Sequence, residues 1–120
     1  MQDKLGNQVA VHLDPDAHQY VISYPSDAAT TIVGRADFQD RDGKEGPERI
    51  FFHTEVGEEY GGRGLASLLI RQALFDTTSA GRRIVAVCPF VKGHLEKHGH
   101  NGAWRKPTSD ELAEFNEEER

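Results

Sequence analysis

The spacing of apolar residues changes once along this chain, from every second residue to a helical repeat, and a glycine-rich stretch marks the change. Before it, four stretches alternate apolar and polar residues as half-buried strands do: 9–13, 20–24, 31–38 and 50–56. After it, residues 64–78 carry an apolar stripe at helical spacing: Ala66, Leu69, Ile70 and Ala73. The order predicts an antiparallel meander followed by a helix.

The alternation also predicts which side chains share a face of the sheet. On the third strand, one face would carry Ile32, Gly34, Ala36 and Phe38. On the fourth strand, one face would carry Ile50, Phe52, Thr54 and Val56, and the other Phe51, His53 and Glu55. Because aromatic residues occur on both faces of the fourth strand, we expect it to be central. The polar residues 39–47 are predicted to form a loop.

A second strand–helix unit follows the first helix. Gly81 is suited to end that helix, residues 83–87 form a short apolar strand, and Pro89 suits the first position of a new helix. Residues 108–111 read Thr-Ser-Asp-Glu, a capping box that predicts a last short helix. The whole order predicts an α/β (α+β) fold with a mixed sheet and flanking helices.

Size and charge narrow the class of protein. The 120 residues suit one domain, 1–120, and the formal net charge of −6 argues against a nucleic-acid partner. No apolar run approaches the roughly 18 residues that span a bilayer, so no membrane partner is expected. The single cysteine, Cys88, excludes an internal disulfide and predicts a free thiol in a cytoplasmic protein.

Three glycines, Gly61, Gly62 and Gly64, lie where the fourth strand meets the helix. Without side chains there, an anion could reach the backbone amides and the positive end of the helix dipole. The same glycines would also suit a tight turn with positive φ, so both interpretations stay open. No Gly-Lys-Ser/Thr follows, and no βαβ unit precedes the stretch, which argues against the usual nucleotide-binding loops.

Cys88 lies at the end of the last predicted strand, directly before Pro89. A thiol at a helix N-terminus has its thiolate stabilised by the helix dipole, so this position predicts an exposed, acidified nucleophile. The alternative is an inert buried cysteine.

The histidines offer a third group of candidates. His94 and His98 would share a helical face, but no second ligand pair supports a zinc site, and we expect no metal. His53 lies in an apolar strand and needs a polar partner there. We expect Trp104, the one tryptophan, to pack in the core.

Taken together, these features resemble the GNAT N-acetyltransferase superfamily. Its coenzyme motif (Gln or Arg, two residues, Gly, one residue, Gly or Ala) falls on residues 61–66, where Gly61 replaces Gln or Arg. A small single-domain branch is more similar still, with a His-Thr-Glu-Val strand and a Cys-Pro-Phe-Val segment, here residues 53–56 and 88–91. The resemblance covers roughly residues 8 to 100, and it assigns no role to the C-terminal extension at about 101–120.

The resemblance implies that the fourth and fifth strands splay apart to admit the pantetheine arm of acetyl-CoA. Backbone groups of the fourth strand would pair with pantetheine amides, at Thr54, Glu55 and Val56. The turn would hold the pyrophosphate, with Gly61, Gly62, Arg63, Gly64, Leu65 and Ala66. The superfamily often uses a tyrosine on the helix after the fifth strand to protonate the leaving thiolate. This chain has no tyrosine after Tyr60, and His94 is the substitute candidate.

We therefore expect transfer of an acetyl group from acetyl-CoA to a primary amine, on a small molecule or a peptide. In a direct route, Glu55 or His53 removes the amine proton. In a covalent route, Cys88 is acetylated first. The alternative is a coenzyme A-binding sensor or partner module without turnover, which the missing tyrosine and Gly61 favour. The sequence indicates neither the acceptor nor the oligomeric state.

Overall fold

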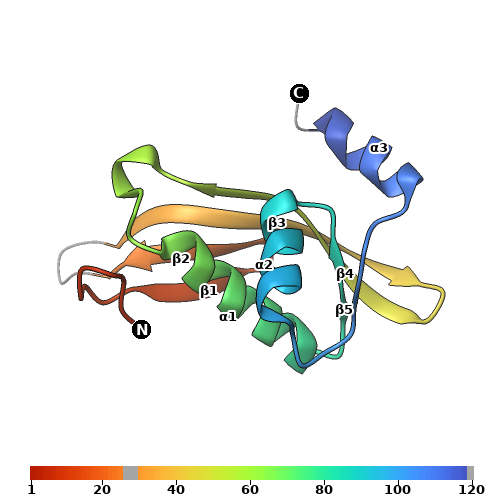
Figure 1. Ribbon diagram of the computed structural model, residues 1–120, viewed down its shortest axis with the longest axis horizontal. Coiled ribbons are helices and arrows are strands. Elements are labelled where there is room, and N and C mark those ends of the chain that lie inside the picture. The colour runs from red at the N-terminus through yellow and green to blue at the C-terminus, as the bar shows by residue number, and fades with distance from the viewer. Residues whose placement is uncertain (26–29, 119–120) are drawn as a thin grey trace.

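Six strands form one mixed sheet in the order β1-β2-β3-β4-β5-β6 (Figure 1). The computed structural model describes residues 1–25 and 30–118, with side chains as far as Phe115. Its elements are β1 (Ala10–Asp14), β2 (Gln19–Tyr24), β3 (Thr31–Gly43), β4 (Gly46–Val56), the short 3-10 helix η1 (Glu58–Tyr60), α1 (Leu65–Ser79), β5 (Arg83–Ala86), α2 (Pro89–His98), β6 (Trp104–Arg105) and α3 (Ser109–Glu118). The first four strands are antiparallel, and β5 and β6 add in parallel. The predicted α/β class is confirmed.

The long β3–β4 hairpin replaces the loop predicted at residues 39–47. Its strands pair as far as Gly43 and Gly46, so Lys44 and Glu45 alone form the turn. The tip has no apolar alternation because opposite charges face each other across the strands, as in the pair of Arg41 and Glu48. The loop prediction was wrong for this reason.

β4 carries one residue more than the stretch of β3 that faces it. Phe38 lies opposite Phe51 and Asp37 opposite His53, which leaves Phe52 without a partner in β3. This is a β-bulge, and beyond it the side chains of β4 change face.

The bulge corrects the faces predicted for β4. Ile50 and Phe52 do pack on one face, in the cluster around Phe115. Val56, however, packs in the cluster on the other face, together with Phe51. Strict alternation had placed Val56 with Ile50, and that prediction was wrong.

A second irregularity lies between β2 and β3. Ile22 faces Gly34 and Ser23 faces Ile32, so Val33 is the extra residue. As a result Val33 is buried, whereas Ile32, predicted on the core face, is 63% exposed.

Two helices cover one face of the sheet and the third helix covers part of the other. Leu69 and Ile70 of α1 and Leu95 of α2 all lie in the large core cluster, and both helices cross the same side of the sheet in Figure 1. Gly81 follows the end of α1 with a φ of 76°, as predicted for a helix stop, and its amide donates to the carbonyl of Thr78.

The C-terminal extension is part of the same structure. Trp104 and Arg105 form β6 beside β5, and the half-buried Trp104 packs against the core as predicted. The capping box is confirmed: the amide of Glu111 donates to the Thr108 hydroxyl, and the amide of Thr108 donates to the Glu111 carboxylate. α3 then buries Phe115 against Phe52 on the second face.

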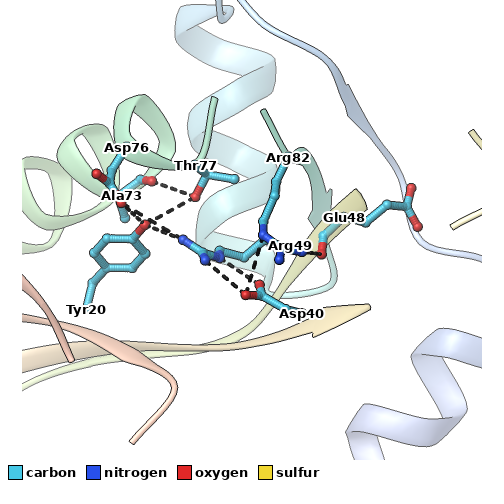
Figure 2. A network of polar contacts seen from close by, with 8 residues as sticks. All are labelled: Tyr20, Asp40, Glu48, Arg49, Ala73, Asp76, Thr77 and Arg82. Atoms are coloured by element: carbon cyan, nitrogen blue, oxygen red, sulfur yellow. Dashed lines mark hydrogen bonds and ion pairs between the residues drawn. The ribbon is translucent and has the colours of Figure 1, made fainter. Parts of the chain in front are cut away.

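A buried arginine ties three strands to α1 (Figure 2). Arg49 of β4 donates to both carboxylate oxygens of Asp40, at 2.7 and 2.9 Å, and to the hydroxyl of Tyr20, at 2.6 Å. Tyr20 donates in turn to Asp76 of α1. Burial and this bond to Asp76 raise the pKa of Tyr20 to about 12. The network fixes where α1 lies on the sheet.

Candidate active site

β4 and β5 separate part of the way along their length. They pair only from Glu48 and Arg83 to Phe51 and Ala86. The amides of Val87 and Cys88 then both donate to the carbonyl of Phe51, at 3.1 and 2.8 Å, and the chain leaves the sheet to begin α2.

Within residues 1–25 and 30–118, no strand pairs with β4 on this side between Phe52 and Val56. We call this unpaired edge, together with Cys88 at the start of α2, the fork. Its backbone groups that point away from β3 can pair with an extended ligand.

Cys88 lies at the closed end of the fork. It is the N-cap residue of α2, with Pro89 as the first helical residue, and its Sγ lies 3.4 Å from the Thr54 hydroxyl. The residue is only 5% exposed and belongs to the core cluster, so the predicted exposed thiol is wrong. The predicted position, after the last strand that the sequence predicts and directly before a helix that begins at Pro89, is confirmed.

The glycine-rich turn lies between the end of β4 and α1. Gly62 and Gly64 both have a φ of 76°, and Gly64 is the N-cap residue of α1. No side chain caps this helix, so the first amides of α1, at Leu65, Ala66 and Ser67, have no partner within the helix. Such a helix terminus suits an anion.

The N-terminal segment packs against this turn. The amide of Lys4 donates to the carbonyl of Arg63 at 3.0 Å, and the Lys4 side chain lies over Gly64. A Cβ at Gly64 would lie 3.2 Å from Lys4 Cε. Nothing in residues 1–7 predicts this contact, because the segment has no apolar periodicity.

Arg63 points into an aromatic pair rather than toward the helix terminus. Its guanidinium lies over the rings of Tyr60 and Tyr24, and it donates to the Tyr24 hydroxyl at 3.3 Å. That hydroxyl also donates to Asp3, which lowers the pKa of the Asp3 carboxyl. In the described structure Arg63 therefore holds the N-terminal segment onto the turn.

Glu55 and His53 lie on the other face of β4 from Thr54 and Cys88. Glu55 faces Arg35 across the strands and pairs with its guanidinium at 3.0 Å. His53 faces Asp37. The two predicted bases are thus next to each other but separated from the thiol by the thickness of the sheet.

A cleft of about 440 Å³ opens beside Glu55. It lies along the ends of β3 and β4 and includes Gln19, Arg35, Glu55 and Glu58 in its lining. The bulges that expose Ile32 and turn Val56 inward shape this cleft, which alternation alone did not predict.

His94 does not lie near the thiol. It is six residues beyond Cys88, or about 9 Å along the helix axis. It lines a separate cavity between α1 and α2. Burial lowers the pKa of His94, and the charges of His98, Arg71 and His100 lower it further.

Two negative findings apply to the described part of the chain. No three His, Cys, Asp or Glu side chains there are grouped so that they could hold a metal ion. None of the helices there combines the length and the apolar character needed to cross a bilayer.

Comparisons with known proteins agree with this geometry. Ribosomal-protein-alanine N-acetyltransferase from Brucella melitensis biovar Abortus 2308 has a similar structure: the TM-score is 0.53 at 18% identity, over 78% of this chain and 71% of that one. An acetyltransferase from Trypanosoma brucei gives a TM-score of 0.50 at 19% identity, over 78% and 70% of the two chains. No match was found among curated proteins.

The fold is therefore similar to that of known acetyltransferases. Residues 19–103 also match the family described as GCN5-related N-acetyl-transferase, and because this is well over half of the chain, the protein belongs to that family. It is an enzyme of the acyltransferase class. The matched residues run from β2 to just before β6, so β1, β6 and α3 lie outside them.

Proposed function

We propose that this protein transfers the acetyl group of acetyl-CoA to a primary amine, with the fork as the acetyl site. The observation that carries the proposal is the unpaired edge of β4, which runs from Cys88 and Thr54 to the uncapped start of α1. A ligand with a narrow amide-bearing arm would fit the unpaired edge of β4, and a diphosphate at the end of that arm would fit the start of α1. Acetyl-CoA has this construction.

The residues of the turn fit a diphosphate. A side chain at Gly62 would meet open space, and Gly64 presents only backbone beside the helix terminus. The amides of Leu65, Ala66 and Ser67 would donate to the phosphate oxygens, supported by the helix dipole. Gly61 supplies no side chain to this site, so backbone groups carry the binding.

The amine acceptor would approach from the face that carries Glu55. The cleft there holds the carboxylates of Glu55 and Glu58, which suit a positively charged amine. When bound, acetyl-CoA supplies a thioester whose C–S bond breaks as the amine nitrogen bonds to the acetyl carbon, and coenzyme A leaves as its thiolate. Glu55, or His53 beside it, takes through water the proton that the amine loses, because both lie on the other face of β4 from Thr54 and Cys88.

Thr54 and Cys88 would line the acetyl group at the closed end of the fork. Because Cys88 is buried and its sulfur lies beside a hydroxyl, we favour direct transfer, with Cys88 shaping the acetyl site. The covalent route requires that the Cys88 sulfur take the acetyl group and pass it to the amine.

The first test uses the full chain with acetyl-CoA and a panel of polyamines, lysine peptides and peptides with free N-termini. Release of free coenzyme A thiol that depends on one class of amine is the expected result. Coenzyme binding without thiol release for any amine would contradict the proposal and favour a sensor module.

Mass spectrometry separates the two routes. With acetyl-CoA and no acceptor, the direct route predicts an unmodified protein. One added acetyl group that is absent from Cys88→Ser would establish the covalent route.

A further inference from the structure

A cavity of about 610 Å³ lies between α1 and α2, apart from the fork. Its polar lining comprises Ser67, Arg71, His94, His98, His100 and Asn101. In the described part of the chain, every titratable side chain of this lining is a base. The protein as a whole has 20 Asp and Glu residues against 14 Lys and Arg residues, a formal net charge of −6 with histidine neutral, so a cavity lined by bases without a carboxylate is unusual for it.

No carboxylate in the described part of the chain forms an ion pair with a base of this cavity. Arg71 makes no ion pair within the described residues. The rings of His94 and His98 lie 4.8 Å apart, and the pKa of His94 is lowered by burial and then by its basic neighbours. A bound anion would pair with the Arg71 guanidinium and would favour the protonated form of the histidines around it.

The neighbouring residues hold this arrangement in place. Thr78 of α1 lies within 2.7 Å of the His100 ring nitrogen, and so fixes the loop that follows α2 against α1. Gly99 ends α2 with a φ of 71°, which lets the chain turn toward α1. The cavity is therefore built from two helices and an anchored loop.

The cavity begins where the proposed diphosphate site ends. Ser67 belongs to the first turn of α1, and Arg71 follows one turn later, about 9 Å along the axis from Leu65. Coenzyme A carries a third phosphate, on the 3′ position of the ribose that follows its diphosphate. This phosphomonoester has close to two negative charges at neutral pH, and a guanidinium is well suited to bind it.

We propose that this cavity binds the 3′-phosphomonoester of coenzyme A through Arg71 and His98. His94 and His100, whose pKa values are lowered by burial, line the same cavity as neutral imidazoles at pH 7. The proposal rests on the proposed function, because it concerns the same coenzyme, and it explains why bases gather here on an acidic protein.

The test compares coenzyme A with 3′-dephospho-coenzyme A by isothermal titration calorimetry of the full chain. The wild-type protein should bind coenzyme A about tenfold or more tightly than the dephospho form. Arg71→Gln and His98→Gln should each weaken binding of coenzyme A and leave the dephospho form within twofold, roughly the scatter expected of distant sites. Both side chains are exposed, so the variants should fold.

Lys97→Gln is the matched control. It removes a basic side chain of α2 next to His98 that does not line the cavity, and it should leave the ratio of the two affinities unchanged. Equal affinities of the wild-type protein for both ligands would overturn this inference and leave the proposed function intact. Failure to bind either ligand would overturn both.

Discussion

Gly64 and Gly81 share one backbone conformation at opposite ends of α1, each with a φ of 76°. A valine at either position should cost on the order of 1–3 kcal/mol, because side chains with branched Cβ atoms rarely adopt positive φ. Only Gly64→Val should also reduce coenzyme affinity, at least about tenfold, because its side chain would press against Lys4 and disturb the turn beside the first amides of α1. Calorimetric titration and urea unfolding of both variants would measure these two effects separately.

Gly81→Val is thus the control for backbone strain. Equal loss of coenzyme affinity in the two variants would show that strain in α1, and not the turn, controls binding. Unchanged affinity in a folded Gly64→Val protein would remove the turn from the coenzyme site.

The carboxylate of Glu55 could accept a proton during the reaction, or it could only neutralise the charge of Arg35. If it is the base, Glu55→Gln should lower kcat about a hundredfold and leave coenzyme affinity nearly unchanged. The ion pair to Arg35 is exposed, so the variant should lose less than about 1 kcal/mol of stability. Steady-state kinetics and urea unfolding would measure both.

Arg35→Gln breaks the same ion pair and keeps the carboxylate. An equal fall in kcat in this variant would mean that Glu55 acts through the pair. Normal turnover in Glu55→Gln would leave His53 as the candidate base.

At the residue scale, the sequence predicted that Cys88 lies at the start of a helix and that the glycine turn has positive φ, and both are confirmed. It placed Glu55 and His53 beside Cys88, whereas the structure puts them on the other face of β4, and it predicted an exposed thiol where Cys88 is buried. The burial of Cys88 depends on helices packed from distant parts of the chain, and local spacing carries no information about that.

At the scale of elements, both strand faces that the sequence mispredicted lie next to a bulge. The alternating pattern assumes that each residue of a strand faces one residue of its neighbour. A single extra residue in one strand therefore moves every later side chain of that strand to the opposite face of the sheet. Phe52 and Val33 are these extra residues, and neither has a side chain that marks it as such. The helices, with caps and breakers of their own, were predicted closely.

α3 provides a test of pH dependence. Hydrogen bonds from Arg105 lower the pKa of Glu111 to about 2, from an ordinary value of 4.5. The folded state thus favours the carboxylate, so its contribution to stability is present above pH 4.5 and is lost as the pH falls toward 2. Glu111→Gln should cost about 1–2 kcal/mol at pH 7, after allowance for solvent screening, and little at pH 2.

Urea unfolding of the wild-type protein and this variant at the two pH values would measure the difference. Glu114→Gln, on the same helix with an exposed pair to Arg41, is the control and should change stability by less than about 1 kcal/mol. A Glu111→Gln cost that stays constant with pH would contradict the role of the carboxylate charge.

For the whole molecule, Arg49 matters because it connects β4 to β3, β2 and α1. Arg49→Met should destabilise the protein by on the order of 3 kcal/mol, because it leaves Asp40 and Tyr20 without their buried partner. Arg82→Met removes a more exposed contact to the same carboxylate, at 3.5 Å, and should cost less than about 1 kcal/mol. Urea unfolding would compare the stabilities of the two variants. Equal losses of stability would mean that the buried network stabilises the protein no more than the surface contact does.

The fork also has a consequence for hydrogen exchange. In most sheets the amides of a central strand exchange slowest, because strands on both sides hold them. Among the residues that the structure describes, no strand lies beside the amides of β4 that point away from β3 beyond Phe51. In the free protein these amides should exchange far faster than those at Ile50 and Phe51. Bound coenzyme would slow them, so the exchange rates along this one strand would record residue by residue how far the ligand reaches into the sheet.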